Sequence, residues 1–147
     1  MTGTVANGNG SGVAGYSGTP LERKLGIAPG SALALISAPA GFAESLELPR
    51  DVTVRSAARG RVDVAVFFAT RRNELDRRFP AFKRALDPAG GLWIAWPKRA
   101  SRVATDLSEN VVREIGLANG LVDNKVAAID DVWSGLRFVY RTADRPR

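Results

Sequence analysis

The sequence predicts an α/β fold: a single three-layer domain with a mostly parallel sheet, helices on both faces and an antiparallel pair of strands at its C-terminal end. Short apolar runs alternate with segments of helical period over most of the chain. The clearest run, residues 62–69, is dense in β-branched and aromatic residues, which is typical of a central parallel strand. The last two strand-like stretches, 122–129 and 136–141, are joined by a connection too short for a parallel crossover.

The length of 147 residues suits one compact domain with a real core. Residues 1–14 are mostly Gly, Asn, Ser and Thr, so we expect a disordered tail, followed by the α/β domain at 15–142 and a frayed C-terminus at 143–147. No stretch has the length and apolarity of a transmembrane helix, and the N-terminus lacks a signal-peptide pattern. We therefore expect a cytoplasmic protein with no membrane partner.

The first third of the chain predicts short elements. Residues 19–22 form a helix-start signature in which Thr19 is the N-cap and a proline follows it. The apolar run 31–38 predicts a strand that is buried on both faces. One helical turn is expected within 42–48, and the alternating segment 51–55 predicts a second strand nearer the sheet edge.

A longer helix is expected from Arg71 to Leu86, with Pro80 kinking or interrupting it. One apolar face follows the helical period, at Leu75, Phe79, Phe82 and Leu86. Residues 87–91 should then end the helix as a turn before the strand that contains Trp93 and Trp96. Because these tryptophans are three positions apart on a strand, they should face opposite sides of the sheet.

The next helix is predicted to start with Asp106 as N-cap and Glu109 at the third helical position. Asn119-Gly120 supplies its C-terminal stop. Its inner face should consist of Leu107, Val111, Ile115 and Ala118. Between the two final strands, Trp133-Ser134-Gly135 is expected to form a compact turn that folds Trp133 over the sheet.

The sequence contains no histidine and no cysteine, which excludes the commonest zinc sites and the His-dependent nucleophile arrangements. The charge is uneven: between Arg55 and Arg102 twelve Lys/Arg face four Asp/Glu, a local +8 within a total of +6. A solvated basic surface explains this, and attraction to nucleic acid or phosphorylated ligands is the alternative. The pair Asp130-Asp131 predicts a polar turn rather than a metal site, since no further ligands stand at a defined spacing.

The strongest candidate for a site is the basic loop that follows the Trp93 strand. In an open α/β sheet ligands gather beyond the carboxyl ends of the strands, and a helix N-terminus there also favours anions. Lys98 and Arg99 would lie at that edge, facing the next helix, although a plain solvated loop is about as good an explanation. The candidate ligand-binding residues are Ser37, Thr70, Trp96, Lys98, Arg99, Arg102, Thr105 and Ser134.

The order of elements and the final antiparallel pair resemble a class I methyltransferase fold, a Rossmann-like α/β architecture, here in a truncated form. Several motifs across residues 15–141 also resemble the small bacterial proteins of the domain of unknown function 3052 family. These are Gly15-Tyr16-Ser17-Gly18, Lys24-Leu25-Gly26-Ile27, Trp96-Pro97-Lys98, Thr105-Asp106-Leu107-Ser108-Glu109-Asn110-Val111-Val112-Arg113-Glu114 and Val132-Trp133-Ser134-Gly135-Leu136. That family's name implies no activity, cofactor or catalytic residue.

The methyltransferase resemblance implies a glycine-rich loop after the first strand and an acidic residue at the end of the second, both serving S-adenosylmethionine. This chain has one glycine in that loop, Gly41, and the pair Arg55-Ser56 at the end of the second strand. We therefore expect no cofactor and a non-enzymatic binding or regulatory module with an anion-binding loop. The alternatives are a transferase that binds S-adenosylmethionine or a nucleotide through an atypical loop, and nucleic-acid binding through the basic surface. The partner would be an anionic small ligand or a protein, with a homo-oligomer also open.

Overall fold

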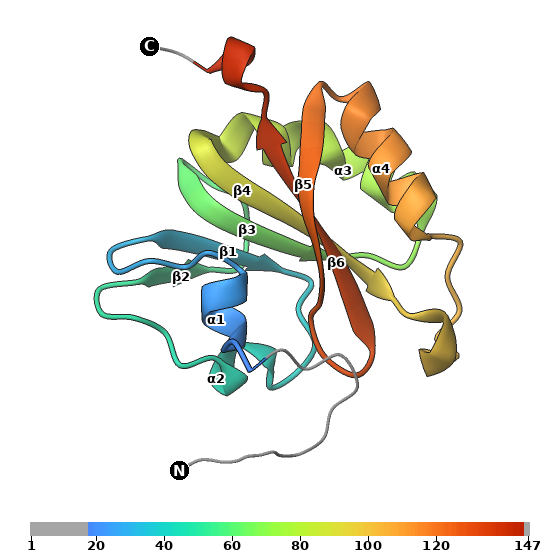
Figure 1. Cartoon of the computed structure of the whole chain (residues 1–147), viewed down its shortest axis with the longest axis horizontal. Coiled ribbons are helices and arrows are strands. Elements are labelled where there is room, and N and C mark those ends of the chain that lie inside the picture. The colour runs from blue at the N-terminus through green and yellow to red at the C-terminus, as the bar shows by residue number, and fades with distance from the viewer. Residues whose placement is uncertain (1–17, 146–147) are drawn as a thin grey trace.

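The computed structural model describes residues 18–145, so the predicted N-terminal tail lies outside the described residues. One sheet has the strand order β2-β1-β3-β4-β6-β5 (Figure 1). Its strands are β1 (Ala32–Ile36), β2 (Thr53–Arg55), β3 (Val62–Phe68), β4 (Leu86–Pro97), β5 (Leu121–Ala128) and β6 (Trp133–Tyr140). The α-helices are α1 (Leu21–Lys24), α2 (Phe42–Ser45), α3 (Arg72–Ala85) and α4 (Glu109–Ala118), and 3₁₀ turns form at Arg99–Ser101 and Thr142–Asp144.

The sheet confirms the predicted topology. The first four strands are mutually parallel, with β3 between β1 and β4 and the short β2 at the edge. β6 runs antiparallel to both β4 and β5, so the two final strands form the expected antiparallel pair. The carboxyl ends of β1, β2, β3 and β4 therefore open on one edge of the sheet, where ligands of such folds gather.

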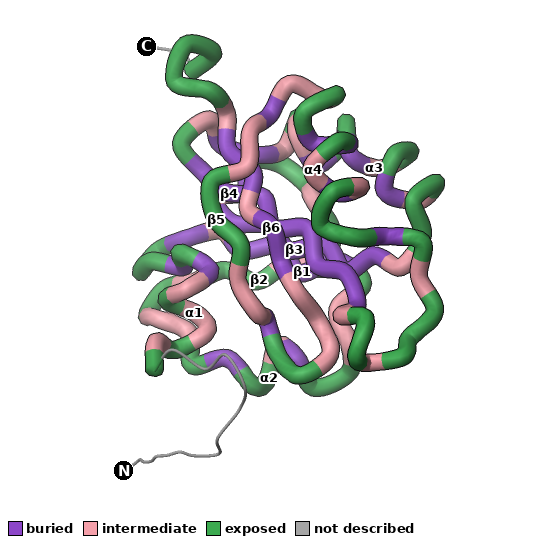
Figure 2. The backbone as a smooth tube through the Cα atoms, turned by 45° about the vertical axis from the view of Figure 1, so that its right-hand side comes forward, coloured by how far each residue is buried: buried purple, intermediate pink, exposed green. Residues whose placement is uncertain are grey.

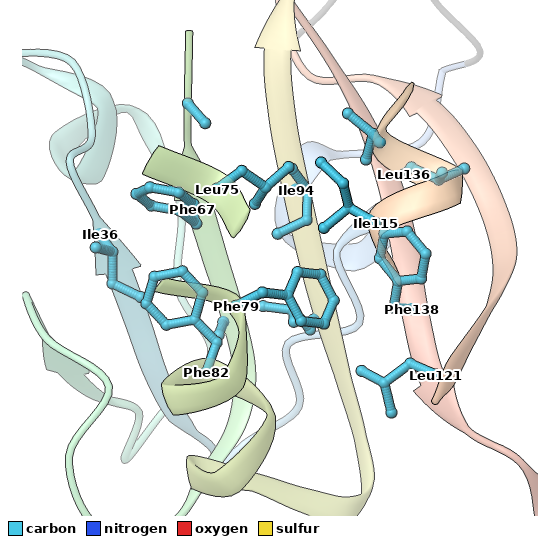
Figure 3. Packing of buried hydrophobic residues seen from close by; sticks show 14 of the residues in the cluster. Ile36, Phe67, Leu75, Phe79, Phe82, Ile94, Ile115, Leu121, Leu136 and Phe138 are labelled. Atoms are coloured by element: carbon cyan, nitrogen blue, oxygen red, sulfur yellow. The ribbon is translucent and has the colours of Figure 1, made fainter. Parts of the chain in front are cut away.

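Apolar clusters cover both faces of the sheet, and the buried segments of Figure 2 follow mainly the central strands β1, β3 and β4. α3 and α4 pack on one face, over a cluster that includes Phe67, Phe79 and Phe138 (Figure 3). α1 and α2 lie on the other face, where the fully buried Trp93 donates its indole N–H to the carbonyl of Leu25 at 3.1 Å. Trp96 belongs to the α3/α4 face, so the two tryptophans lie on opposite sides as predicted.

The helix α3 has three of the four predicted apolar positions and no interruption at Pro80; the fourth, Leu86, was predicted in the helix but begins β4. Leu75, Phe79 and Phe82 are buried. The proline removes one amide donor from the helix, which leaves the carbonyl four residues earlier, that of Asp76, without its helical partner. Pro80 and Asp76 are both exposed. Water can satisfy that carbonyl, and α3 continues through Pro80, so the predicted interruption was wrong, while the alternative of a kink stays a prediction.

Residues 87–91 lie within β4 and do not form a separate turn, contrary to prediction. Leu86 pairs with Val62 and Gly91 pairs with Val64, so the intervening residues of β4 bulge out of the ladder. A side chain at Gly90 would clash with the carbonyl of Asp63, which explains why the bulge requires glycine there.

The connection from β2 to β3 has no helix. Both strands are parallel to β1 and flank it, yet only residues 56–61 link them, about half of an ordinary crossover. We call this connection, residues 56–61, the strap. The Arg55 guanidinium stabilises it, because its Nη1 donates to the carbonyls of Arg59 at 2.7 Å and Arg61 at 3.1 Å. Because β2 has only three residues, the chain needs to travel back only a short way along the sheet to begin β3, and six residues are enough.

Three local predictions near helix ends and the final hairpin are corrected. The N-cap of α1 is Pro20, in extended conformation, rather than Thr19. The inner face of α4 is rotated, with Val112 and Gly116 buried in place of the predicted Val111 and Ala118, and Gly116 packs against the Phe138 ring. Residues 133–135 begin β6 and are not a turn, although Trp133 does pack over the sheet, edge-on to Phe68 at 5.1 Å. The predicted stop at Asn119-Gly120 is confirmed.

Candidate functional site

A cleft of about 560 Å³ opens where β4 ends and α4 begins. The chain runs from the arrowhead of β4 through a loop to α4 (Figure 1). Residues of this loop line the cleft. We call it the Lys98 cleft; its lining residues are Trp96, Pro97, Lys98, Arg99, Arg102, Val103, Ala104, Thr105, Leu107, Ser108, Glu109 and Ser134. Six of the eight predicted site residues are thus brought together, and the other two, Ser37 and Thr70, lie outside this lining.

The basic side of the cleft is a compact loop with its own hydrogen bonds. A 3₁₀ turn at Arg99–Ser101 ends at Arg102, whose φ of 63° is uncommon for a residue other than glycine. Ser101 donates its hydroxyl to the carbonyl of Lys98 at 2.7 Å. The backbone N–H of Lys98 in turn donates to the carbonyl of Val132 at 2.7 Å, which ties the loop to the β5–β6 hairpin. The three cations therefore project from an ordered turn.

The opposite side is formed by the segment that leads into α4. Thr105 donates its hydroxyl to the carbonyl of Thr70 at 2.7 Å and accepts the N–H of Leu107 at 3.0 Å. Thr70 therefore contributes its backbone carbonyl, which holds Thr105 in place, and is not itself part of the lining. Ser108 is the N-cap of α4, and its hydroxyl accepts the N–H of Val111 at 3.3 Å.

Asp106 was predicted as that N-cap, and the structure gives it a different role. Its carboxylate accepts the N–H of Arg72 at 2.7 Å, so it caps α3 across the loop. The N-cap residue of α3, Arg71, has no side-chain acceptor to offer its own helix. A carboxylate at a helix N-terminus is also favoured by the helix dipole. Asp106 thus joins the wall of the Lys98 cleft to the neighbouring helix.

The cleft carries unneutralised positive charge. Within residues 18–145 the side chains of Lys98, Arg99 and Arg102 make no ion pair and no hydrogen bond. The one carboxylate in the lining, Glu109, is bound by Arg113 at 2.6 Å. Hydrogen bonds to Glu109 and to Asp123 raise the pKa of Arg113 above its ordinary value. Because Glu109 is paired with Arg113, which is not part of the lining, the three cations face the cleft without a counter-charge.

The remaining lining is apolar. Trp96 and Leu107 are each 6% exposed and form the base of the cleft, whereas Val103 is 43% exposed on its loop. Val103 therefore adds exposed apolar surface to the lining, beside the three basic side chains. Sequence reasoning missed Val103, Ser108 and Leu107 as lining residues. The serine of Leu107-Ser108-Glu109 was a usable signal, because serine competes with aspartate as an N-cap.

A second cleft, of about 620 Å³, lies beyond the ends of β1 and β2. We call it the Ser37 cleft; its lining residues are Leu35, Ser37, Ala38, Pro39, Ala40, Gly41, Ala43, Glu44, Val54, Arg55 and Ser56. Ser37 adopts a left-handed φ of 59°, and Gly41 one of 83°. The helix that follows, α2, is a single turn.

S-adenosylmethionine in the pose that the methyltransferase resemblance implies does not fit the Ser37 cleft. The loop has one glycine, Gly41, for close approach of the cofactor. At the end of β2, where an acidic residue would accept the ribose hydroxyls, stands Arg55, and its guanidinium already holds two carbonyls of the strap. The side chains needed for that pose are therefore absent or occupied.

The structure offers no metal centre among the residues that it describes, since no three His, Cys, Asp or Glu side chains cluster there. The predicted polar turn is present: the Asp130 carboxylate accepts the N–H groups of Val132 at 2.8 Å and Trp133 at 2.9 Å. In the same part of the chain, no helix is both long enough and apolar enough to cross a bilayer.

Comparisons with known proteins identify the fold. Neither a protein-family model nor a curated protein sequence matches the chain, so the resemblance to the domain of unknown function 3052 family gains no support from them. Among solved structures, two of magnesium protoporphyrin IX methyltransferase from Synechocystis PCC 6803 are similar. The one with bound SAH has a TM-score of 0.54 at 12% identity over 77% of this chain and 75% of that one. The one with bound SAM has a TM-score of 0.54 at 11% identity over 82% and 74%. The chain therefore has a methyltransferase-like α/β fold.

Proposed function

We propose that this chain binds a small anionic ligand in the Lys98 cleft. One observation carries the proposal: Lys98, Arg99 and Arg102 line a cleft of ligand size and have no acceptor in the described chain. Pockets for small ligands commonly measure roughly 300–1,000 Å³, so the volume is suitable. Guanidinium groups bind carboxylates and phosphates through paired N–H donors. The N-terminus of the ten-residue helix α4 lies on the opposite side of the cleft, where its dipole also favours an anion.

Between the functions open to such a site, a ligand-binding transferase has better support than a non-enzymatic module. The similar solved structures are methyltransferases, one of them with SAM bound. The misfit at Arg55 argues against S-adenosylmethionine in the usual pose, so a transferase of this fold would take an anionic ligand in the Lys98 cleft. Membership of the domain of unknown function 3052 family remains a proposal that rests on the quoted motifs alone.

Isothermal titration calorimetry with sodium pyrophosphate tests the proposal. The variant Lys98→Ala/Arg99→Ala should weaken pyrophosphate binding by about 100-fold, because a hydrogen bond to a charged group is worth on the order of 1.5 kcal/mol. The matched control is Arg77→Ala/Arg84→Ala, which removes the same charge from α3, where neither side chain makes an ion pair within residues 18–145. The control should lose less than about threefold, as distant surface charges are screened.

Two outcomes would contradict the proposal. Absent binding of pyrophosphate by the parent protein at low salt would remove the anion site altogether. Equal losses in the two double variants would show that general charge, not the cleft, attracts the anion. A DNA duplex in the same titration tests the nucleic-acid alternative: affinity that falls steeply with salt and falls equally in the two double variants would favour it.

A further inference from the structure

We infer that the ligand of the Lys98 cleft is a nucleoside phosphate, with its phosphates at the three cations and its base against Val103. This inference rests on the proposed function and deepens it, because it names the chemical class that the same cleft would take. It draws on three features of the cleft: the arrangement of its lining, its size and its charge.

The lining of the cleft contains a group of basic side chains and a group of apolar side chains. Lys98 and Arg102 flank the 3₁₀ turn and Arg99 begins it, so the positive charge is concentrated on this loop. The apolar surface comes from the base, Trp96 and Leu107, and from the exposed Val103. A ligand that satisfies both parts carries negative charge at one end and an apolar group at the other.

The size of the cleft argues against a bare inorganic anion as its ligand. A phosphate ion would engage the cations but would occupy only a small part of about 560 Å³ and leave Val103 exposed to water. A base and ribose joined to the phosphates would cover that side chain. Removing apolar surface from water stabilises a complex, so the nucleoside part should add affinity.

The charge of the cleft selects among nucleoside ligands. Each of the three cations lacks a counter-charge, and a diphosphate supplies several negative charges and many acceptor oxygens. S-adenosylmethionine carries a sulfonium and an ammonium beside its single carboxylate, so its net positive charge opposes the site.

The test compares four probes by calorimetry on the full chain: ADP, sodium pyrophosphate, adenosine and S-adenosylmethionine. ADP should bind about tenfold more tightly than pyrophosphate, and adenosine and S-adenosylmethionine should bind more weakly than either. The variant Val103→Ser should lower ADP affinity by about threefold or more and leave pyrophosphate affinity unchanged. Lys98→Ala/Arg99→Ala should weaken both. Because Val103 is exposed, its replacement should not affect folding, which a thermal melt checks.

The failures of the two proposals are distinguishable. Equal affinity for ADP and pyrophosphate, or a Val103→Ser variant that weakens both alike, overturns the nucleoside assignment and leaves the anion site intact. No binding of either anion overturns the proposed function and this inference together. Tightest binding of S-adenosylmethionine or of adenosine overturns the assignment of the phosphates to the cations.

Discussion

Two clefts open on the same edge of the sheet, and they use their basic side chains in opposite ways. In the Ser37 cleft, the guanidinium of Arg55 donates hydrogen bonds to the carbonyls of Arg59 and Arg61. In the Lys98 cleft, three basic side chains have no acceptor among residues 18–145. Local positive charge therefore indicates a ligand only after the acceptors of the chain itself have been taken into account. The +8 counted from Arg55 to Arg102 includes cations of both kinds.

The clefts also differ in what lies behind them. The Lys98 cleft is walled by α4, which packs into the main core through Val112, Ile115 and Gly116. The Ser37 cleft is formed by loops, one turn of helix and the edge strand β2, which is exposed at Val54. A wall that is fixed by a core preserves the shape of the cleft, and a preformed cleft binds a ligand with less ordering cost.

The largest effect is expected from Gly116→Ala. A methyl group there would clash with the Phe138 ring, so α4 must move away from the sheet, at a cost of about 2 kcal/mol or more of unfolding free energy. Pyrophosphate affinity should fall as well, because α4 walls the cleft. Gly41→Ala is the counterpart in the Ser37 cleft: no atom lies within 4 Å, but the φ of 83° costs about 1–2 kcal/mol. Urea denaturation measures both, and a smaller loss for Gly116→Ala would break the comparison.

An intermediate effect is expected from Arg55→Ala. The strap between β2 and β3 loses both hydrogen bonds, and since this region is partly solvated we expect a loss of about 1–2 kcal/mol in unfolding free energy. Pyrophosphate binding should not change. Arg59→Ala is the control, because it keeps the backbone carbonyl that Arg55 binds. If Arg55→Ala left stability intact and weakened the anion instead, Arg55 would belong to the binding machinery.

The smallest effect is expected from Asp106→Ala. The N-terminus of α3 loses its carboxylate acceptor, which is worth about 1 kcal/mol. Asp131→Ala, at an exposed residue with no hydrogen bond or ion pair in the described chain, should change unfolding free energy by less than about 0.5 kcal/mol. Urea denaturation of the two variants in parallel measures the difference. Identical midpoints would show that the hydrogen bond from the Arg72 N–H to Asp106 does not contribute to the unfolding free energy.

The periodicity of apolar residues predicts most of the fold. The buried run of β3 follows from its density of β-branched and aromatic residues, and the Leu75–Phe82 face of α3 follows from a 3.6-residue repeat; both are confirmed. Features that depend on distant partners escape such reasoning. Asp106 and Ser108 are both good N-caps, and only the approach of Arg72 in three dimensions decides between them. The bulge in β4 depends likewise on the close approach of Asp63 to Gly90.

The candidate site divides in the same way. The position of Lys98 and Arg99 after a parallel strand is enough to predict that they lie at the carboxyl edge. The sequence does not show that Arg113 would neutralise Glu109, or that Val103 would stay exposed in the lining, since both depend on side-chain packing. Ser37 and Thr70 follow their strands as expected but belong to the other cleft and to the backbone behind the wall.

The hydrogen bond from the Lys98 amide to the Val132 carbonyl means that exchange of this one amide proton reports on the contact between the basic loop and the β5–β6 hairpin. That amide is held at 2.7 Å by the tip of the β5–β6 hairpin, more than thirty residues further along the chain. Its exchange with deuterium therefore requires the basic loop and the hairpin to separate. Exchange that is much slower than that of its exposed neighbours, and slower again with an anion bound, would mean that the two segments open together and that the ligand holds them closed.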